Sequence, residues 1–146
     1  MTDKQILSAS GSNSLQVHST NDADFPLAQK LDAHKVGCHH VVTNAKGSKA
    51  VSIGFGGEVI IWACHDGAWS KMKETTFADL WAVALSSDGQ YLAGTTQGGH
   101  IKVWDLDANE EEIRDNETKG SFGTCIDLVS IFFCFSYYVY MLIWHL

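Results

Sequence analysis

Basic residues are scarce in this chain. Its 146 residues include 10 Lys and Arg against 17 Asp and Glu, which gives a formal net charge of −7. A protein that binds nucleic-acid phosphates directly needs clustered Lys and Arg, so this balance argues against direct nucleic-acid binding. The most acidic segment contains residues 110–112 (Glu-Glu-Glu), Asp115 and Glu117. We interpret it as the solvated edge of an outer strand, because charged edges deter pairing with other chains.

Sequence motifs of known catalytic sites are also missing. The chain has no Gly-x-Ser-x-Gly elbow, no phosphate-binding loop and no His-Glu-x-x-His pair. Its paired glycines stand in turns without the following helix that phosphate binding would use. The sequence therefore predicts no catalytic residues, no cofactor and no enzymatic activity.

The cysteines and histidines do not have the spacing of a metal site. Cys38 is followed directly by His39 and His40, and Cys64 is followed directly by His65. Zinc ligands are usually separated by two to four residues, so we predict no metal site and expect Cys38 to pack inside a sheet. The first residues, Met-Thr-Asp-Lys, lack the apolar core of a secretory signal, so the thiols are expected to be reduced. The cysteines are Cys38, Cys64, Cys125 and Cys134.

A repeat becomes visible when the sequence is shifted against itself. A shift of 42 residues lays 39–63 on 81–105 without a gap. A shift of 44 residues lays 6–18 on 50–62, and a fourth copy begins at 122–128. The unit therefore occurs at least three times, and a fixed period of this length is typical of repeat folds.

Each unit consists of short strands joined by tight turns. Thirteen glycines against one proline suit such turns. In the third unit, residues 80–85, 90–96 and 100–105 are expected strands, separated by Ser-Ser-Asp-Gly and Gln-Gly-Gly turns. More polar outer strands are expected at 69–74 and 111–117.

The third strand of the middle unit is apolar on both faces. Val59 and Ile61 point to one face. Ile60 and Trp62 point to the other. Such a strand is buried between neighbouring sheets. Four-stranded sheets that repeat about every 40–45 residues and pack face to face are the blades of a β-propeller. We therefore predict an all-β fold, a partial propeller of about three blades.

A known family shares this pattern. The turn Ser-Ser-Asp-Gly, followed by Gly-Gly-His-Ile-Lys-Val-Trp-Asp at the end of the third unit, resembles a WD repeat. The resemblance extends from residue 4 to about residue 128.

The WD-repeat resemblance implies a hydrogen-bonded brace in each blade. Its members are a His before the first strand, a Ser in the second strand, an Asp in the next turn and the Trp. In the middle unit His34, Ser52 and Trp62 stand at three of these positions, whereas Gly56 stands at the Asp position. The third unit has Thr76, Gly94 and Gly98 at the equivalent positions and keeps the final Trp104 and Asp105.

Three longer stretches narrow the resemblance. They are similar to fungal members of the small WD-repeat subunit of the superkiller (Ski) complex, whose relatives also serve in meiotic recombination. The three stretches are LSASGSNSLQVHSTNDADFPLAQKLDAHKVGCHHV, GFGGEVIIW and ETKGSFGTCIDL. The resemblance implies a seven-bladed, non-catalytic scaffold. In the cytoplasm it would join helicase and TPR subunits in a complex that feeds messenger RNA to the exosome. In the nucleus it would support meiotic double-strand-break proteins. Catalysis in the central funnel of a propeller is the alternative.

The resemblance also implies where partners would bind. WD propellers generally bind at the start of the innermost strand and at the turn after the second strand. His39 and Trp81 stand at the first position, and Phe55 and Gln97 at the second. Trp81 is the preferred residue because tryptophan is enriched at binding hot spots, although packing between blades would equally account for it.

The repeats account for less than three whole blades, so we interpret the chain as a fragment or an arc of a propeller. We expect a partial blade at 4–20, blades at 34–76 and 77–118, the start of another blade at 119–128 and an apolar tail at 129–146.

The tail has several possible explanations. Residues 128–146 are 19 residues without a formal charge, about the length of a membrane-spanning helix. A membrane anchor would make the chain a tail-anchored WD-repeat adaptor. However, the stretch begins inside a blade strand, is rich in aromatic residues and lacks flanking basic residues. We favour translated intron, because Val129 and Ser130 can be encoded by GTAAGT, a typical splice donor. An ordinary buried segment is the third possibility.

Overall fold

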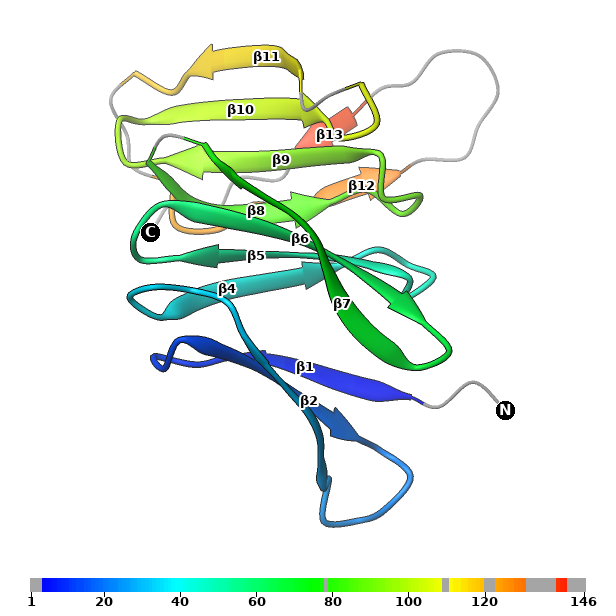
Figure 1. Ribbon diagram of the computed structural model, residues 1–146. Helices are drawn as coiled ribbons and strands as arrows, with labels where there is room; N and C mark the ends of the chain where they lie inside the picture. Colours follow the sequence, from blue (N-terminus) through cyan, green and yellow to red (C-terminus); the bar gives the residue numbers. More distant parts are fainter. Residues whose placement is uncertain (1–3, 78, 109–110, 120–122, 131–138, 142–146) are drawn as a thin grey trace. The chain divides into compact units, whose positions relative to one another are not determined.

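The computed structural model describes residues 4–77, 79–108, 111–119, 123–130 and 139–141, and every regular element in these ranges is a β-strand (Figure 1). The strands are β1 (Gln5–Ala9), β2 (Ser14–Ser19), β3 (Leu27–Asp32), β4 (Cys38–Thr43), β5 (Lys49–Gly54), β6 (Glu58–His65), β7 (Ala68–Thr76), β8 (Leu80–Leu85), β9 (Tyr91–Thr96), β10 (His100–Asp105), β11 (Glu111–Glu117), β12 (Leu128–Ser130) and β13 (Val139–Met141).

The strands form four sheets. Their orders are β1-β2-β3, β4-β5-β6-β7, β8-β9-β10-β11 and β12-β13, so each longer sheet follows the chain as a meander. Every strand pair whose register is known is antiparallel. The predicted all-β fold is confirmed, and β8, β10 and β11 have the bounds expected from the sequence.

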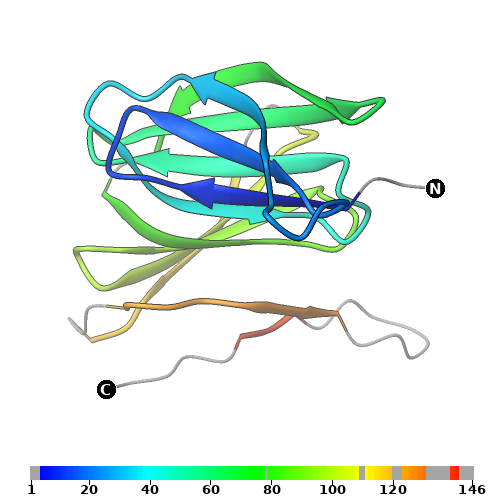
Figure 2. The same ribbon diagram turned by 90° about the horizontal axis from the view of Figure 1, so that it is seen from below.

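The chain divides into two compact units. The first unit comprises Met1–Val41 and Gly47–Phe77. Inside it, apolar side chains of the first and second sheets form one buried cluster, and Figure 2 shows the blue strands of the first sheet overlying the cyan and green strands of the second. The strand predicted to be apolar on both faces, β6, is buried on both, since residues 59–62 are all nearly inaccessible to solvent. The cluster contains Leu15, Val17, Leu31, Cys38, Ala50, Ile60, Trp62 and Trp69.

The second unit comprises Val42–Lys46 and Ala78–Leu146. Its buried cluster is built mainly from small residues of β8 and β9, with Ile101 of β10. Ile126 also enters this cluster, from the segment before β12. That segment is fixed to β9 because Thr95 Oγ1 donates a hydrogen bond of 2.8 Å to the Gly123 carbonyl.

Two turns show how local sequence sets the sheet register. Asp66 and Gly67 alone connect β6 to β7, and both have positive φ (51° and 81°), as the two-residue type I′ hairpin turn requires. Between β8 and β9, the Asp88 carboxylate accepts hydrogen bonds from Ser86 Oγ (2.6 Å) and from the Gln90 backbone N–H (3.0 Å). The second turn is the Ser-Ser-Asp-Gly sequence that marked the repeat.

The first sheet extends beyond the partial blade expected at 4–20. It includes β3, which pairs with β2 from Ser14↔Asp32 to His18↔Leu27. In β3 only Leu31 is buried, and the other residues are exposed or partly exposed. An outer strand with a single buried residue gives little alternation of apolar and polar positions, so the pattern did not reveal it.

Little of the apolar tail falls within the described residues. The backbones of β12 and β13 pair from Leu128↔Met141 to Ser130↔Val139 (orange and red in Figure 2). Residues 131–138 and 142–146 lie outside the described part of the chain. In that described part, no helix is long and apolar enough to cross a membrane.

Candidate functional site

Two of the residues expected to bind partners lie together in the second sheet. His39 is the second residue of β4, and Phe55 follows the last residue of β5. Their rings are stacked at a tilt of 32°, with centroids 4.8 Å apart. Phe55 is 56% exposed although it is large and apolar. The contact therefore presents an aromatic surface to solvent at the end of the sheet where β4 begins.

A neighbouring loop completes this surface. Val36 is 62% exposed and precedes Gly37, whose carbonyl accepts a hydrogen bond of 3.0 Å from the Phe55 N–H. We call Val36, His39 and Phe55 the rim patch. Its loop is held at a second point, because the Lys35 N–H donates to Glu58 Oε1 at 2.7 Å. The rim patch thus exposes the apolar side chains of Val36 and Phe55, with the partly buried His39 ring against Phe55, on a backbone fixed by hydrogen bonds.

The other two expected residues belong to the third sheet. Trp81 lies at an irregularity in the pairing of β8 with β9, where the register shifts between Leu80 and Ala82. Such bulges redirect side chains. Trp81 is partly buried and packs against the small-residue cluster of its own unit, so it contributes to packing. Gln97 follows β9, is exposed, and donates its backbone N–H to the Asp79 carbonyl at 3.0 Å.

The middle blade contains the contacts expected of the brace. His34 Nε2 lies 2.7 Å from Ser52 Oγ, and Trp62 Nε1 donates a hydrogen bond of 2.9 Å to the same oxygen. All three side chains are buried. These contacts connect the loop before β4 to β5 and β6.

The third blade uses its Trp-Asp pair differently. Trp104 is buried, and the space beside it that a brace serine would use is closed around Gly94. Asp105 Oδ1 accepts hydrogen bonds from the backbone N–H groups of Asp107 and Ala108, and Oδ2 accepts one from Gln90 Nε2. Asp105 therefore caps the turn after β10.

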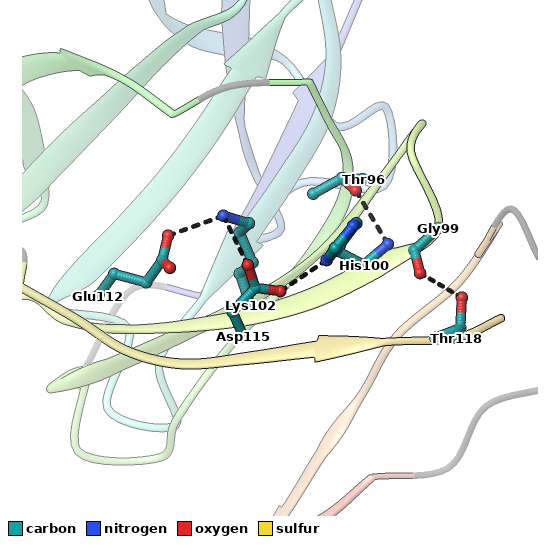
Figure 3. Close-up of polar contacts among 7 residues, drawn as sticks. All are labelled: Thr96, Gly99, His100, Lys102, Glu112, Asp115 and Thr118. Carbon is teal, nitrogen blue, oxygen red and sulfur yellow. Dashed lines mark hydrogen bonds and ion pairs between the residues drawn. The ribbon is translucent and has the colours of Figure 1, made fainter. Parts of the chain in front are cut away.

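The acidic outer strand β11 is paired with basic residues of β10. Lys102 Nζ lies 3.0 Å from Glu112 Oε2 and 3.1 Å from Asp115 Oδ2, and His100 Nδ1 lies 2.7 Å from Asp115 Oδ1 (Figure 3). Hydrogen bonds from His100 and then Lys102 lower the pKa of the Asp115 carboxyl, while Glu112 and Asp115 raise the pKa of Lys102. Glu112, Asp115 and Glu117 are exposed at this edge, as expected, whereas Glu110 and the side chain of Glu111 lie outside the described residues. Glu112 and Asp115 also tie β11 to β10.

The cysteine and histidine run at the start of β4 has no arrangement suited to metal or nucleophilic chemistry. Burial raises the pKa of the Cys38 thiol to about 11, so the thiol stays protonated at neutral pH. Cys38, Cys64 and Cys125 are free thiols, and Cys134 lies outside the described residues. Within the described ranges, no group of three or more His, Cys, Asp or Glu side chains could hold a metal ion.

Acidification is expected to destabilise the fold through the buried His34 and the partly buried His40. Burial lowers the pKa of His34 below its ordinary 6.5, against a weaker opposing attraction from Glu58, and burial with repulsion from His39 lowers the pKa of His40. The unfolded chain then binds more protons as the pH falls below about 6.5, so the free energy of unfolding should fall too. Urea unfolding at about pH 7.5, 6.5 and 5.5 measures the free energy of unfolding at each pH. His40→Gln should make this free energy depend less on pH. A midpoint that rises on acidification would contradict the prediction.

Comparison with known proteins places the chain among WD-repeat proteins. No family model matches the chain. Over 125 residues it is 35% identical to the meiotic recombination protein rec14 of Schizosaccharomyces pombe. The aligned region covers 84% of this chain and 41% of rec14. Over 107 residues it is 22% identical to the WD repeat-containing protein SL1-17 of Schistosoma mansoni. This alignment covers 73% of this chain and 36% of that protein. The chain thus spans about two fifths of the length of these relatives.

A solved structure identifies the architecture. The β-propeller domain of Cps50 (Swd1) from Myceliophteria thermophila superposes with a TM-score of 0.70 and 11% sequence identity, over 84% of this chain and 40% of that one. At this identity the likeness shows the fold alone. The antiparallel four-stranded meanders are accordingly propeller blades. Together with the sequence similarity, this fold shows that the chain is a WD-repeat β-propeller protein related to the meiotic recombination protein rec14.

Proposed function

We propose that this chain belongs to a non-enzymatic scaffold that holds protein subunits together, and that the rim patch is one of its binding surfaces. The observation that carries the proposal is the His39–Phe55 ring pair, in which Phe55 is exposed and His39 is partly buried. Aromatic side chains on a rigid backbone bind partners well, because they bury a large area and lose little conformational freedom. The hydrogen bonds of the adjoining loop supply that rigidity.

We further propose that the complex acts in meiotic recombination, in the nucleus. The support is the 35% identity to a protein named for that process. A role in the cytoplasmic Ski complex, with helicase and TPR subunits, is the finer part of the proposal and is supported by the sequence resemblance described above. Both roles require protein partners, and neither requires direct binding of nucleic acid or catalysis by this chain.

Phe55→Ala should weaken partner binding without unfolding the protein. Truncation of an aromatic hot-spot residue typically reduces affinity by about tenfold or more. The side chain is exposed in the free protein, so the free energy of unfolding should change by less than about 0.5 kcal/mol. The tagged chain would be expressed in fission-yeast cells and recovered together with the proteins bound to it. Double-strand-break proteins are expected from meiotic cells, and Ski helicase and TPR subunits from vegetative cells.

Met72→Ala is the matched control. Met72 is 61% exposed, comparable to Phe55, but it lies on the outer strand β7. The control should retain partners that the Phe55 variant loses. Equal recovery by the Phe55 variant would exclude the rim patch as a binding surface. Failure of the unaltered chain to recover either set of proteins would count against the scaffold role itself.

A further inference from the structure

Glu58 is a buried acid that the brace pattern does not include. It is the first residue of β6 and is only 5% exposed, although burial of a charged carboxylate without partners is costly. Its Oε1 accepts the Lys35 N–H at 2.7 Å. Its Oε2 is fully buried and has no hydrogen-bond partner among the described residues.

His34 has the complementary unpaired atom. Its side chain is 3% exposed and its Nε2 contacts Ser52 Oγ, but its Nδ1 is buried without a hydrogen-bond partner in the described part of the chain. The two unpaired atoms border the same point, the space above Gly54. A Cβ atom on Gly54 would lie 2.5 Å from His34 Nδ1 and 2.7 Å from Glu58 Oε2.

Gly56 shows which side chain the carboxylate replaces. A Cβ atom at this position would lie 2.6 Å from Glu58 Oε2 and 3.1 Å from Oε1, so the carboxylate occupies the space of a residue-56 side chain. Residue 56 is the brace position at which an aspartate is expected. An acid at residue 58 and a side chain at residue 56 therefore compete for one place.

The hydrogen bonds of the brace are compatible with a proton on His34 Nδ1, the atom that borders the same space as Glu58 Oε2. Trp62 Nε1 can only donate, so Ser52 Oγ accepts from it and has its own proton available for His34 Nε2. A neutral His34 that accepts at Nε2 carries its proton on Nδ1. Burial lowers the pKa of His34, which keeps the ring neutral. Burial would raise the pKa of the Glu58 carboxyl, but hydrogen bonds from the Lys35 and Glu58 backbone N–H groups hold it below its ordinary value and keep the group ionised.

We propose that Glu58 supplies the acid of the middle-blade brace, accepting the His34 Nδ1 proton in place of the turn aspartate of the WD-repeat pattern, and that the missing side chains of Gly54 and Gly56 make room for it. Glu58 is a positioning residue. Through His34 and the Lys35 N–H it fixes the loop that carries Val36. This inference goes beyond the scaffold function and does not depend on it.

The proposal is tested on the full 146-residue chain with Glu58→Ala, Gly56→Asp and the double variant Gly56→Asp/Glu58→Ala. Two readouts are needed: the His34 tautomer from imidazole ¹⁵N NMR, and the unfolding equilibrium constant from urea titration. The unaltered chain should hold its proton on Nδ1. Glu58→Ala should abolish this preference and raise the unfolding constant by about tenfold or more, because a hydrogen bond to a charged group is lost and buried polar atoms are left unpaired.

The double variant makes the test specific. An aspartate introduced at residue 56, in the absence of the Glu58 carboxylate, should restore the Nδ1–H tautomer and much of the lost stability. Gly56→Asp alone should be less stable than the double variant, because two carboxylates then compete for one site. Glu74→Ala, which removes an exposed acid on β7, should change neither readout. An Nε2–H tautomer in the unaltered chain, an unchanged tautomer in Glu58→Ala, or a double variant no better than Glu58→Ala, folded or not, would overturn the proposal.

Discussion

Gly37→Ala is expected to lower the free energy of unfolding by about 3 kcal/mol, because alanine would be forced into a backbone conformation that L-residues rarely adopt. Gly37 has φ of +116°. A Cβ atom there would also lie 2.7 Å from the Gly11 carbonyl oxygen, a backbone atom that no side-chain rotation can move away. Relief of the clash would disturb the neighbouring Cys38 N–H, which donates to the carbonyls of both Ser10 (3.0 Å) and Ser12 (3.2 Å).

Gly11→Ala is the control for this prediction. Gly11 lies in the loop that Gly37 contacts, but its own Cβ would meet nothing within 4 Å and its φ is not in the left-handed region. Its replacement should therefore be neutral or stabilise the fold by less than about 1 kcal/mol. Urea titration of both variants gives the comparison. Equal stabilities for the two would show that the junction between the first and second sheets tolerates a side chain at residue 37.

The blades could be predicted because their signals are local. In the third unit, turn residues delimit short apolar runs, and these runs became β8 and β10 with the expected bounds. β3 carries no such signal, since Leu31 alone is buried there. Whether a polar segment pairs with the edge of a sheet depends on the neighbouring strand. The sequence of the segment itself therefore does not reveal the pairing.

The candidate site was predictable in part. The WD-repeat resemblance gave His39 and Phe55 as two separate binding positions, and their contact became visible only in the structure, where the start of β4 lies beside the end of β5. The depth of Trp81 depends on the size of its neighbours, and the small residues of its cluster leave room for part of the ring.

Glu58 could not have been found from motif spacing. It stands two residues beyond the expected aspartate, on a strand instead of in the turn. One signal was present in the sequence: a charged residue stands directly after two glycines and directly before the apolar run at 59–64. Glycines beside a buried acid indicate that the carboxylate occupies the space that their side chains would fill.

Trp69→Ala is expected to lower the free energy of unfolding by about 3–5 kcal/mol, because it removes a large buried ring at the junction of two sheets. The ring belongs to the buried cluster that contains residues of both sheets. Its Nε1 donates a hydrogen bond of 2.9 Å to Gln5 Oε1 on β1. The Trp69 backbone N–H donates to Gln29 Oε1 at 2.9 Å, and Gln29 Nε2 donates to the Trp69 carbonyl at 2.8 Å. Gln29 thereby pairs with β7 much as a neighbouring strand would.

Two variants separate the contributions at this junction. Trp69→Phe keeps an aromatic ring and the backbone pairing but removes the bond to Gln5, so a loss of about 1–2 kcal/mol is expected. Gln29→Ala keeps the indole and removes both bonds to the Trp69 backbone, with an expected loss of similar size. Urea unfolding of all three variants should place Trp69→Ala well below the other two. If Trp69→Ala costs no more than Trp69→Phe, packing of the ring does not hold the sheets together, and the two glutamines account for the junction. If Gln29→Ala costs as much as Trp69→Ala, the amide pairing is the dominant contact, because only that variant leaves the ring intact while unpairing the edge of β7.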